Sequence, residues 1–269
     1  MKLRLLFLIL ILFCSLMTFG QRETVASNEK IIMVVLAHPD DETAMGPVLA
    51  KYAADNKVYL VLAADGRYGT REHAGIPAGD SLAQIRKVET ICSCNALGIE
   101  PPIFLGFHDG LGSRTGLGEY FRQTAKLKEK LKLLMEEINP DVIITFGPDG
   151  DTGHPDHRAI SDITTEIILR EGWYEKYPLH FVGFPNDETD TSFTSAELNS
   201  VDEKYLNVRI KYNEAHREKH FESIRCHKSQ WTEDEMNEWL EMEKSNTSYT
   251  AYFRKFVVDT NIKKDFFEK

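Results

Sequence analysis

Short apolar runs recur along the chain, and a polar turn follows most of them. They are rich in valine, isoleucine and leucine, as is typical of strands buried on both faces of a sheet. Longer stretches with apolar residues at helical spacing lie between them. This alternation predicts an α/β fold, Rossmann-like, with three αβα layers and a mostly parallel sheet. The expected strands are Ile31–Leu36, Lys57–Ala63, Pro102–Phe107, Asp141–Phe146 and Leu179–Phe184.

The helices are read from apolar residues spaced three or four positions apart. One helix is expected to begin at Asp80 or Ser81 and to end at Gly98. Its apolar residues share one face, which should pack on the sheet. These residues are Leu82, Ile85, Val88 and Ile91. Other helices are expected over Glu42–Asn56, around Leu127–Ile138 and around Ile160–Ile168.

The last third of the chain is more polar. Asn186–Glu203 is acidic and indicates a loop insertion, and Tyr205–Cys226 predicts a long charged helix. Thr232 and Glu235 have the spacing of a capping box, so another helix should begin there. Ser248–Asp259 is the expected final strand.

The N-terminus has the pattern of a secretory signal peptide. Lys2 and Arg4 precede an apolar run, and a small residue, Gly20, precedes the expected cleavage point. An uncleaved anchor is the alternative. A lipid anchor at Cys14 is disfavoured because bulky Phe13 precedes it. We therefore expect residues 1–20 to direct export to the periplasm or outside the cell, and residues 21–269 to form a single domain without a membrane span.

The net charge and the cysteine content limit the expected partners and disulfide bonds. The formal charge of −10 becomes −12 when the two basic residues of the signal segment are removed. An acidic chain lacks the basic face that phosphate contacts need, so nucleic acid is not an expected partner. The exported part keeps Cys92, Cys94 and Cys226. An odd number is no disulfide framework, and we expect these cysteines to be buried and unpaired.

Histidines and carboxylates follow the first and fourth expected strands. His38 and Asp41 lie in the turn after the first, and His157 lies in the turn after the fourth. These strands are often neighbours in doubly wound sheets, beside the switch in strand order. Two histidines and one carboxylate are a catalytic zinc set with an open fourth position. We expect one zinc ion per chain at the carboxyl ends of the strands, with other first-row metals such as iron or cobalt also possible.

Further polar residues in the same turns suit catalysis. Asp40 adjoins a ligand and can take a proton from a metal-activated water as general base. His154 can polarise a carbonyl or protonate a leaving amine, and Asp156 can orient a histidine through its second ring nitrogen. Glu42 is expected to be structural, in the first turn of a helix. Either turn alone could be a helix cap or a surface turn; two of them after buried strands favour a site.

These motifs resemble the PIG-L/LmbE family of zinc-dependent N-deacetylases. Ala37–Glu42 (AHPDDE) and Gly153–His157 (GHPDH) carry the resemblance. It extends over about residues 31–230, with Gly66, Arg86-x-x-Glu89, Asp109 and His227-x-Ser229-Gln230 in support. The family removes acetyl groups from N-acetylglucosamine-type sugars.

The resemblance implies roles for individual residues. The zinc ligands it implies are His38, Asp41 and His157. Asp40 matches the base and His154 the oxyanion or proton-donor residue. Arg86 matches a substrate-contacting arginine, and Asp109 a residue that contacts a sugar hydroxyl.

Two departures from the family concern the substrate. Thr152 stands where some members have a tyrosine that assists the oxyanion, and Arg67 stands where an acid is common. His227 is left outside the expected site. The resulting expectation is a zinc-dependent hydrolase that removes the N-acetyl group from an amino sugar, free or in an oligosaccharide. The alternatives are hydrolysis of another amide or ester, and carbohydrate binding without turnover.

Overall fold

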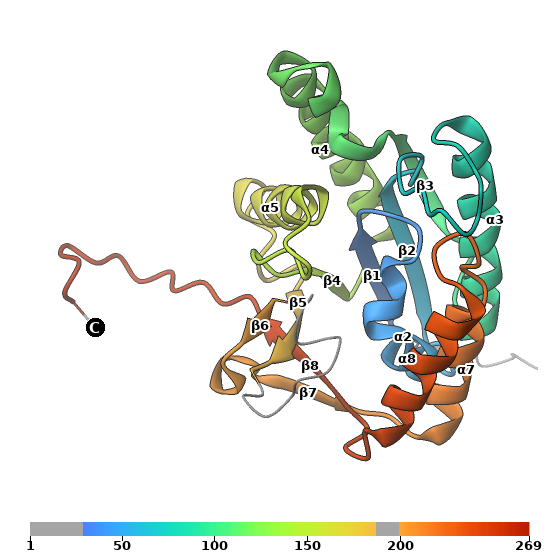
Figure 1. The fold of residues 1–269 in the computed structure, drawn as a ribbon. Coiled ribbons are helices and arrows are strands. Elements are labelled where there is room, and N and C mark those ends of the chain that lie inside the picture. The colour runs from blue at the N-terminus through green and yellow to red at the C-terminus, as the bar shows by residue number, and fades with distance from the viewer. Residues whose placement is uncertain (1–28, 187–198, 269) are drawn as a thin grey trace, which may run out of the picture.

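A computed structural model describes residues 29–186 and 199–268, and these residues build a mostly parallel sheet (Figure 1). Its strand order is β3-β2-β1-β4-β5-β8-β7, and β6 pairs with β5. The first five strands are parallel, whereas β8 pairs antiparallel with both of its neighbours, β5 and β7. The bounds are β1 Ile31–Leu36, β2 Lys57–Ala64, β3 Ile103–Phe107, β4 Val142–Phe146, β5 Leu179–Pro185, β6 Ser200–Val201, β7 Val208–Lys211 and β8 Thr250–Lys255.

Helices cover both faces of the sheet, which gives the predicted αβα layers. Helices α2, α3, α7 and α8 lie on one side, and α4 and α5 lie on the other (Figure 1). The helices are α2 Gly46–Tyr52, α3 Asp80–Leu97, α4 Leu117–Ile138, α5 Pro155–Arg170, α7 Glu214–Ile224 and α8 Glu233–Ser245. Short 3₁₀ helices are η1 Asp41–Met45, η2 Asp109–Thr115 and η3 Glu203–Tyr205.

The pairing of β1 with β4 sets the position of the candidate site. Ile32, Met33 and Val34 of β1 lie opposite Val142, Ile143 and Ile144 of β4. The chain moves outward from β1 to β3 and then returns to β4 on the other side of β1, so the strand order switches between these two strands. The turns after both strands therefore open at the same edge of the sheet. The predicted fold class is confirmed.

The predicted helix over Tyr205–Cys226 is wrong in its first half. The chain there forms η3 and then β7, whose Val208 and Ile210 alternate with more exposed neighbours. β7 pairs antiparallel with β8, and such edge pairing is invisible to a pattern read along one segment. The helix itself, α7, begins only after Asn213, whose side chain caps the His216 amide.

Helix α3 turns a different face to the core from the one predicted. Leu82 is buried, but the side chains of Ile85, Val88 and Ile91 are 37–65% exposed. The buried face instead carries mainly polar side chains and small apolar ones. The polar members of this buried face are Arg86, Glu89, Thr90 and Ser93. The apolar stripe was misleading because α3 packs its polar face against the site and α7.

The cysteine prediction is wrong for two of the three residues. Cys92 of α3 and Cys226, just after α7, form a disulfide, with their Cα atoms 5.7 Å apart. Cys94 is buried and free, as expected. An odd number of cysteines does not prevent one pair from bonding: Cys226 lies 134 residues from Cys92 along the chain, and the packing of α3 against α7 brings the two together.

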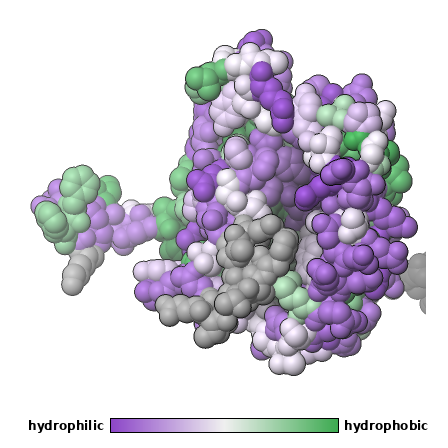
Figure 2. Space-filling model, viewed as in Figure 1, coloured by the Kyte–Doolittle hydropathy of each residue, from purple (hydrophilic) through white to green (hydrophobic). Residues whose placement is uncertain are grey.

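Most of the surface seen in Figure 2 is hydrophilic, with hydrophobic residues at the tip of α4, on the α3 side and along the C-terminal tail. Within the described ranges, every helix is too short or too polar to cross a membrane. The predicted signal segment, residues 1–20, lies outside those ranges, so the division of the chain at residue 20 stays a prediction. Large apolar residues that are strongly exposed include Leu117 and Phe121 of α4, Val88 of α3, and Ile262, Phe266 and Phe267 of the tail.

Loss of the disulfide is expected to destabilise the domain. The bond closes a loop of 134 residues, and removing such a bond costs about 2–5 kcal/mol of unfolding free energy. Cys92→Ser with Cys226→Ser should therefore unfold at lower denaturant concentration than the wild type. Cys94→Ala is the matched control, because it removes a cysteine but keeps the bond. Equal midpoints for the double variant and the wild type, both without reductant, would contradict the disulfide's role.

Candidate metal and catalytic site

The carboxylate of Asp41 stabilises the turn after β1 through hydrogen bonds to the backbone. Its Oδ2 accepts hydrogen bonds from the backbone amides of Ala37 and His38, at 3.0 and 2.7 Å. The other oxygen, Oδ1, lies 3.2 Å from Nε2 of His157, and Oδ2 lies 3.8 Å from Nδ1 of His38. All three side chains are almost fully buried. The three residues predicted as metal ligands therefore meet at one point between β1 and β4.

Both histidines are oriented through their second ring nitrogen. Nε2 of His38 lies 3.0 Å from Oδ2 of Asp156, and Nδ1 of His157 lies 3.0 Å from the carbonyl oxygen of Gly150. The ring of His157 also stacks on Phe146, with centroids 4.1 Å apart. An acceptor on one nitrogen leaves the other, which faces Asp41, free to bind a metal once its proton is lost. The contact expected of Asp156 is present, and its share in catalysis stays a prediction.

The electrostatics of the three residues suit a cation. Burial acts to raise the pKa of Asp41, but His157 and His38 hold it well below the usual range. Burial acts to lower the pKa of His157, but the charge and hydrogen bond of Asp41 outweigh it and raise the pKa to about 9. The proton that Asp41 stabilises on His157 marks a position where a positive charge is favoured. A metal ion bound at this position would displace that proton.

His154 gives the site a third imidazole. It is the N-cap of α5, where its Nδ1 accepts the amide of Asp156 at 3.1 Å. Its ring centroid lies 4.8 Å from that of His38 and 5.0 Å from that of His157. One nitrogen from each of the three histidines lies within 4.8 Å of the other two. His154 is therefore a rival of Asp41 as third ligand, although the sequence assigned it to the oxyanion or the leaving group.

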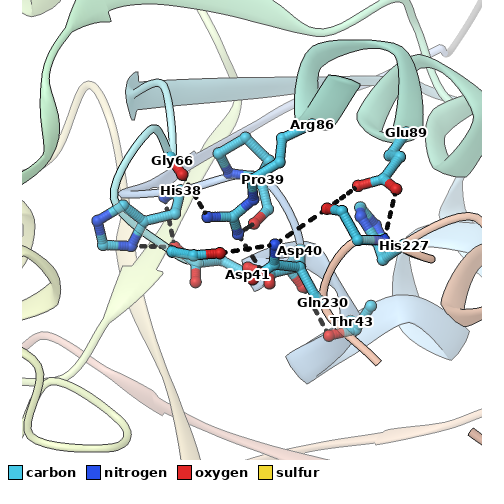
Figure 3. Close-up of polar contacts among 12 residues, drawn as sticks. His38, Pro39, Asp40, Asp41, Thr43, Gly66, Arg86, Glu89, His227 and Gln230 are labelled. Atoms are coloured by element: carbon cyan, nitrogen blue, oxygen red, sulfur yellow. Dashed lines mark hydrogen bonds and ion pairs between the residues drawn. The ribbon is translucent and has the colours of Figure 1, made fainter. Parts of the chain in front are cut away.

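Asp40 lies beside the three candidate ligands and faces Arg86. Its Oδ2 is 2.8 Å from Nη2 of Arg86 (Figure 3). Burial raises the pKa of Asp40 above that of an ordinary carboxyl group, and the guanidinium opposes the rise. A carboxylate of raised pKa is a stronger base, as proton transfer requires.

Arg86 and Asp109, predicted to bind substrate, make contacts within the protein. Arg86 is 4% exposed and donates to the carbonyl oxygens of Gly66 and Pro39, at 3.0 and 2.5 Å. Asp109 accepts the amides of Gly66 and Tyr68, at 2.7 and 2.9 Å. Both residues hold the loop after β2 against the site, and their contact with substrate stays a prediction.

Two buried groups near the site were missed. His227 has no exposed surface, and its Nε2 lies 2.7 Å from Oε1 of Glu42, also fully buried. Burial acts to lower the pKa of His227, but Glu42 outweighs it and raises the pKa. Asp151 has a left-handed backbone with φ of 60°, and burial raises its pKa to about 7. The only sequence signal for His227 was its place in the His227-x-Ser229-Gln230 motif.

The two departures from the family pattern lie at the margin of the site. Thr152 is exposed. Arg67 pairs with Asp65 at 2.8 Å and with Asp80 at 3.0 Å, so its charge is neutralised locally.

This chain is similar in sequence to known proteins over the region that contains both motifs, and similar in fold to solved structures. The family model described as GlcNAc-PI de-N-acetylase (PIG-L) matches residues 33–168. A relative from Bacillus cereus, named "Probable N-acetyl-alpha-D-glucosaminyl L-malate deacetylase 2", is 27% identical over 66% of this chain and 78% of its own. The "1D-myo-inositol 2-acetamido-2-deoxy-alpha-D-glucopyranoside deacetylase" of Mycobacteroides abscessus is 32% identical over 53% of this chain. The chain spans 56% of that relative's length.

Solved structures support the fold. N,N'-diacetylchitobiose deacetylase from Pyrococcus horikoshii superposes with a TM-score of 0.61 and 19% identity, over 85% of this chain and 84% of its own. The hydratase GalB from Pseudomonas putida KT2440 superposes with a TM-score of 0.59 and 14% identity, over 87% and 99%. Since one fold hosts several chemistries, these likenesses establish architecture alone. The match of the family model over half of the sequence, with both of its histidine–aspartate turns at one edge of the sheet, places this chain in the PIG-L (GlcNAc-PI de-N-acetylase) family.

Proposed function

We propose that this protein is a zinc-dependent N-deacetylase of an N-acetylglucosamine-type amino sugar. One observation carries the proposal. His38, Asp41 and His157 converge between β1 and β4, with the carboxylate of Asp40 beside them and each histidine oriented from behind. The names of the family and of the related deacetylases support the acetamido substrate.

The donor set fits a zinc ion. Nε2 of His38 is engaged by Asp156, so Nδ1 is the free nitrogen, and it faces Asp41. Asp41 presents Oδ1, and His157 presents Nε2. We therefore assign His38, Asp41 and His157 as ligands, rather than the three histidines. A zinc ion held there would polarise the acetyl carbonyl and lower the pKa of a coordinated water.

The protein's own residues carry the protons. Asp40 accepts a proton from the attacking water on its carboxylate, and Arg86 holds that carboxylate in place. His154, exposed at the start of α5, hydrogen-bonds the carbonyl oxygen or delivers a proton to the leaving nitrogen. The C–N bond breaks, and acetate and the free amino sugar leave. Asp156 keeps the ring of His38 in its orientation throughout.

We also propose export to an oxidising compartment. The basic and apolar pattern of residues 1–20 supports it. The Cys92–Cys226 disulfide supports it independently, because such bonds persist outside the reducing cytosol. An envelope glycan or an external oligosaccharide is then a more accessible substrate than a cytosolic precursor.

The purified protein, loaded with zinc, is expected to release acetate from one or more N-acetylated amino sugars. A panel of N-acetylglucosamine, its glycosides and chitooligosaccharides tests this, with the matching free amines as blanks. Acetate and new amine should appear in equal amounts. Binding of these sugars without acetate release would favour a carbohydrate-binding protein, and release only from other amides or esters would favour a different hydrolase.

Metal content separates the two possible ligand sets. Asp41→Asn and His157→Ala should lose most of the bound zinc at a fixed chelator concentration, because each removes a ligand. His154→Ala should keep it. Zinc per chain can be measured by elemental analysis after dialysis. Loss of zinc from His154→Ala with retention in Asp41→Asn would replace our assignment by the three histidines.

The variant Asp40→Asn distinguishes a general base from a metal ligand. The change keeps the size of the side chain but removes its basicity, and general-base catalysis typically contributes about 10²–10⁴ in rate. We expect kcat to fall by that factor, while zinc content and substrate affinity stay near wild-type values. Acetate release, zinc analysis and sugar binding measure the three quantities. Unchanged acetate release would show that another residue is the base.

A further inference from the structure

The candidate base, Asp40, is held in an unusual backbone conformation. Its φ of 92° and ψ of −20° lie in the left-handed region, which residues other than glycine rarely adopt. Such a conformation persists only when surrounding contacts impose it. The carbonyl oxygen of Asp40 accepts the amide and the hydroxyl of Thr43, at 3.0 and 2.6 Å. Its amide donates to Oε2 of Glu42, at 3.1 Å.

Glu42 bridges the amide of Asp40 to a buried histidine. Its second oxygen, Oε1, lies 2.7 Å from Nε2 of His227 and also accepts the hydroxyl of Ser93. Because Oε1 is a carboxylate oxygen, Nε2 of His227 must be the donor. The carboxylate is thus fixed at both oxygens, and through it the position of His227 reaches the backbone of Asp40.

The segment that carries His227 is itself anchored. Ser229 donates its amide and hydroxyl to Glu89 of α3, both at 2.7 Å, and Gln230 donates to the carbonyl oxygen of Gly69 at 3.0 Å. The disulfide at Cys226 ties the segment to α3 directly before His227. Figure 3 shows this segment on one side of Asp40, with His38 on the other. His227 is therefore a fixed support.

Arg86 completes the enclosure of the carboxylate. Its guanidinium contacts Pro39, Gly66 and Asp40, all within 3.0 Å (Figure 3). A Cβ atom on Gly66 would lie 2.4 Å from Nη1 of Arg86, and φ there is 71°, so only glycine leaves this space. Backbone and side chain of Asp40 are thus constrained by different partners.

Burial of a glutamate–histidine pair carries a desolvation cost that the attraction between the two groups often only offsets. Apolar residues of similar volume often stabilise a protein as well or better. Each partner depends on the other to avoid an unpaired buried charge, and neither can reach solvent. The pair is better explained by the conformation that it imposes on its neighbour than by a gain in stability.

We propose that His227 is a positioning residue for the base, acting through Glu42 to hold the backbone of Asp40 in its left-handed conformation. The assignment of Asp40 as base rests on the proposed function, whereas the backbone contact does not. Among the described residues, the side chain of His227 bonds Glu42 and none of the three proposed ligands, and it is fully buried. Its loss should therefore change the placement of the carboxylate and leave the metal in place.

Hydrogen exchange at the Asp40 amide tests the contact without any enzymatic assay. His227→Leu removes the donor to Glu42 and should speed exchange of this amide, whereas His227→Gln keeps an amide donor and should largely restore protection. His220→Leu is the matched control. His220 of α7 is also buried, and Nδ1 of both histidines lacks a partner in the described part of the chain, but only His227 bonds Glu42 there, through Nε2. If His227→Leu does not fold, His227→Asn replaces it, since its shorter amide does not reach Glu42.

Kinetics test the consequence for catalysis. His227→Leu should lower kcat by roughly 10–10²-fold, with KM and zinc content unchanged, because small misplacements of a catalytic group have effects of this size. In the Asp40→Asn background, the same change should have little further effect, since the base it positions is already gone. His220→Leu should leave kcat near the wild-type value in either background.

Two results would overturn the proposal. One is unchanged exchange of the Asp40 amide in folded His227→Leu or His227→Asn. The other is an equal fold-loss of kcat in the wild-type and Asp40→Asn backgrounds, as a general structural defect would cause. If the wild type releases no acetate from any sugar, the proposed function fails, but the exchange comparison still decides whether His227 holds Asp40.

Discussion

The parallel pairing of β1 with β4 is the interaction on which the site depends. The strand order reverses between β1 and β4, which are parallel neighbours. The turns that follow them therefore lie at the same edge of the sheet. Each turn is then closed by short hydrogen bonds of its own. Oδ2 of Asp41 collects two backbone amides, and Nδ1 of His157 is fixed on Gly150. The sheet brings the groups together, and the local bonds aim them.

The sheet and the convergence of the three candidate ligands were predictable because their signals are local. β1 was predicted with its exact bounds, since a run of buried aliphatic residues ends at a polar turn containing proline. His38 and Asp41 were singled out by their place in the turn after β1, and His157 by its place in the polar segment that follows β4. The helix start at Thr232 was also confirmed, as its capping box lies within four consecutive residues. Each of these features is decided within one segment, together with the usual neighbourhood of strands.

The support behind the site was not predictable, because its contacts join distant segments. The apolar stripe of α3 suggested that Val88 faces the core, yet the structure exposes it and buries Arg86 and Glu89. Periodicity assumes an apolar core, whereas this helix packs on polar groups that supply partners for its own. Nothing near Cys92 indicated Cys226, and nothing near Glu42 indicated His227. Such pairings depend on the packing of α7 and the segment after it against α3 and η1, which only the assembled fold reveals.

The distance along the chain between Glu42 and His227 has a consequence for folding. These residues are 185 positions apart, so the loop that their contact closes spans most of the domain. Long-range contacts of this kind form after local ones, and the entropy of loop closure delays them. A nascent chain can complete β1–β4 while residues beyond α7 are still being synthesised. The strands that carry the proposed metal ligands can therefore assemble early, whereas the contacts that support Asp40 are completed only with the last segment of the chain.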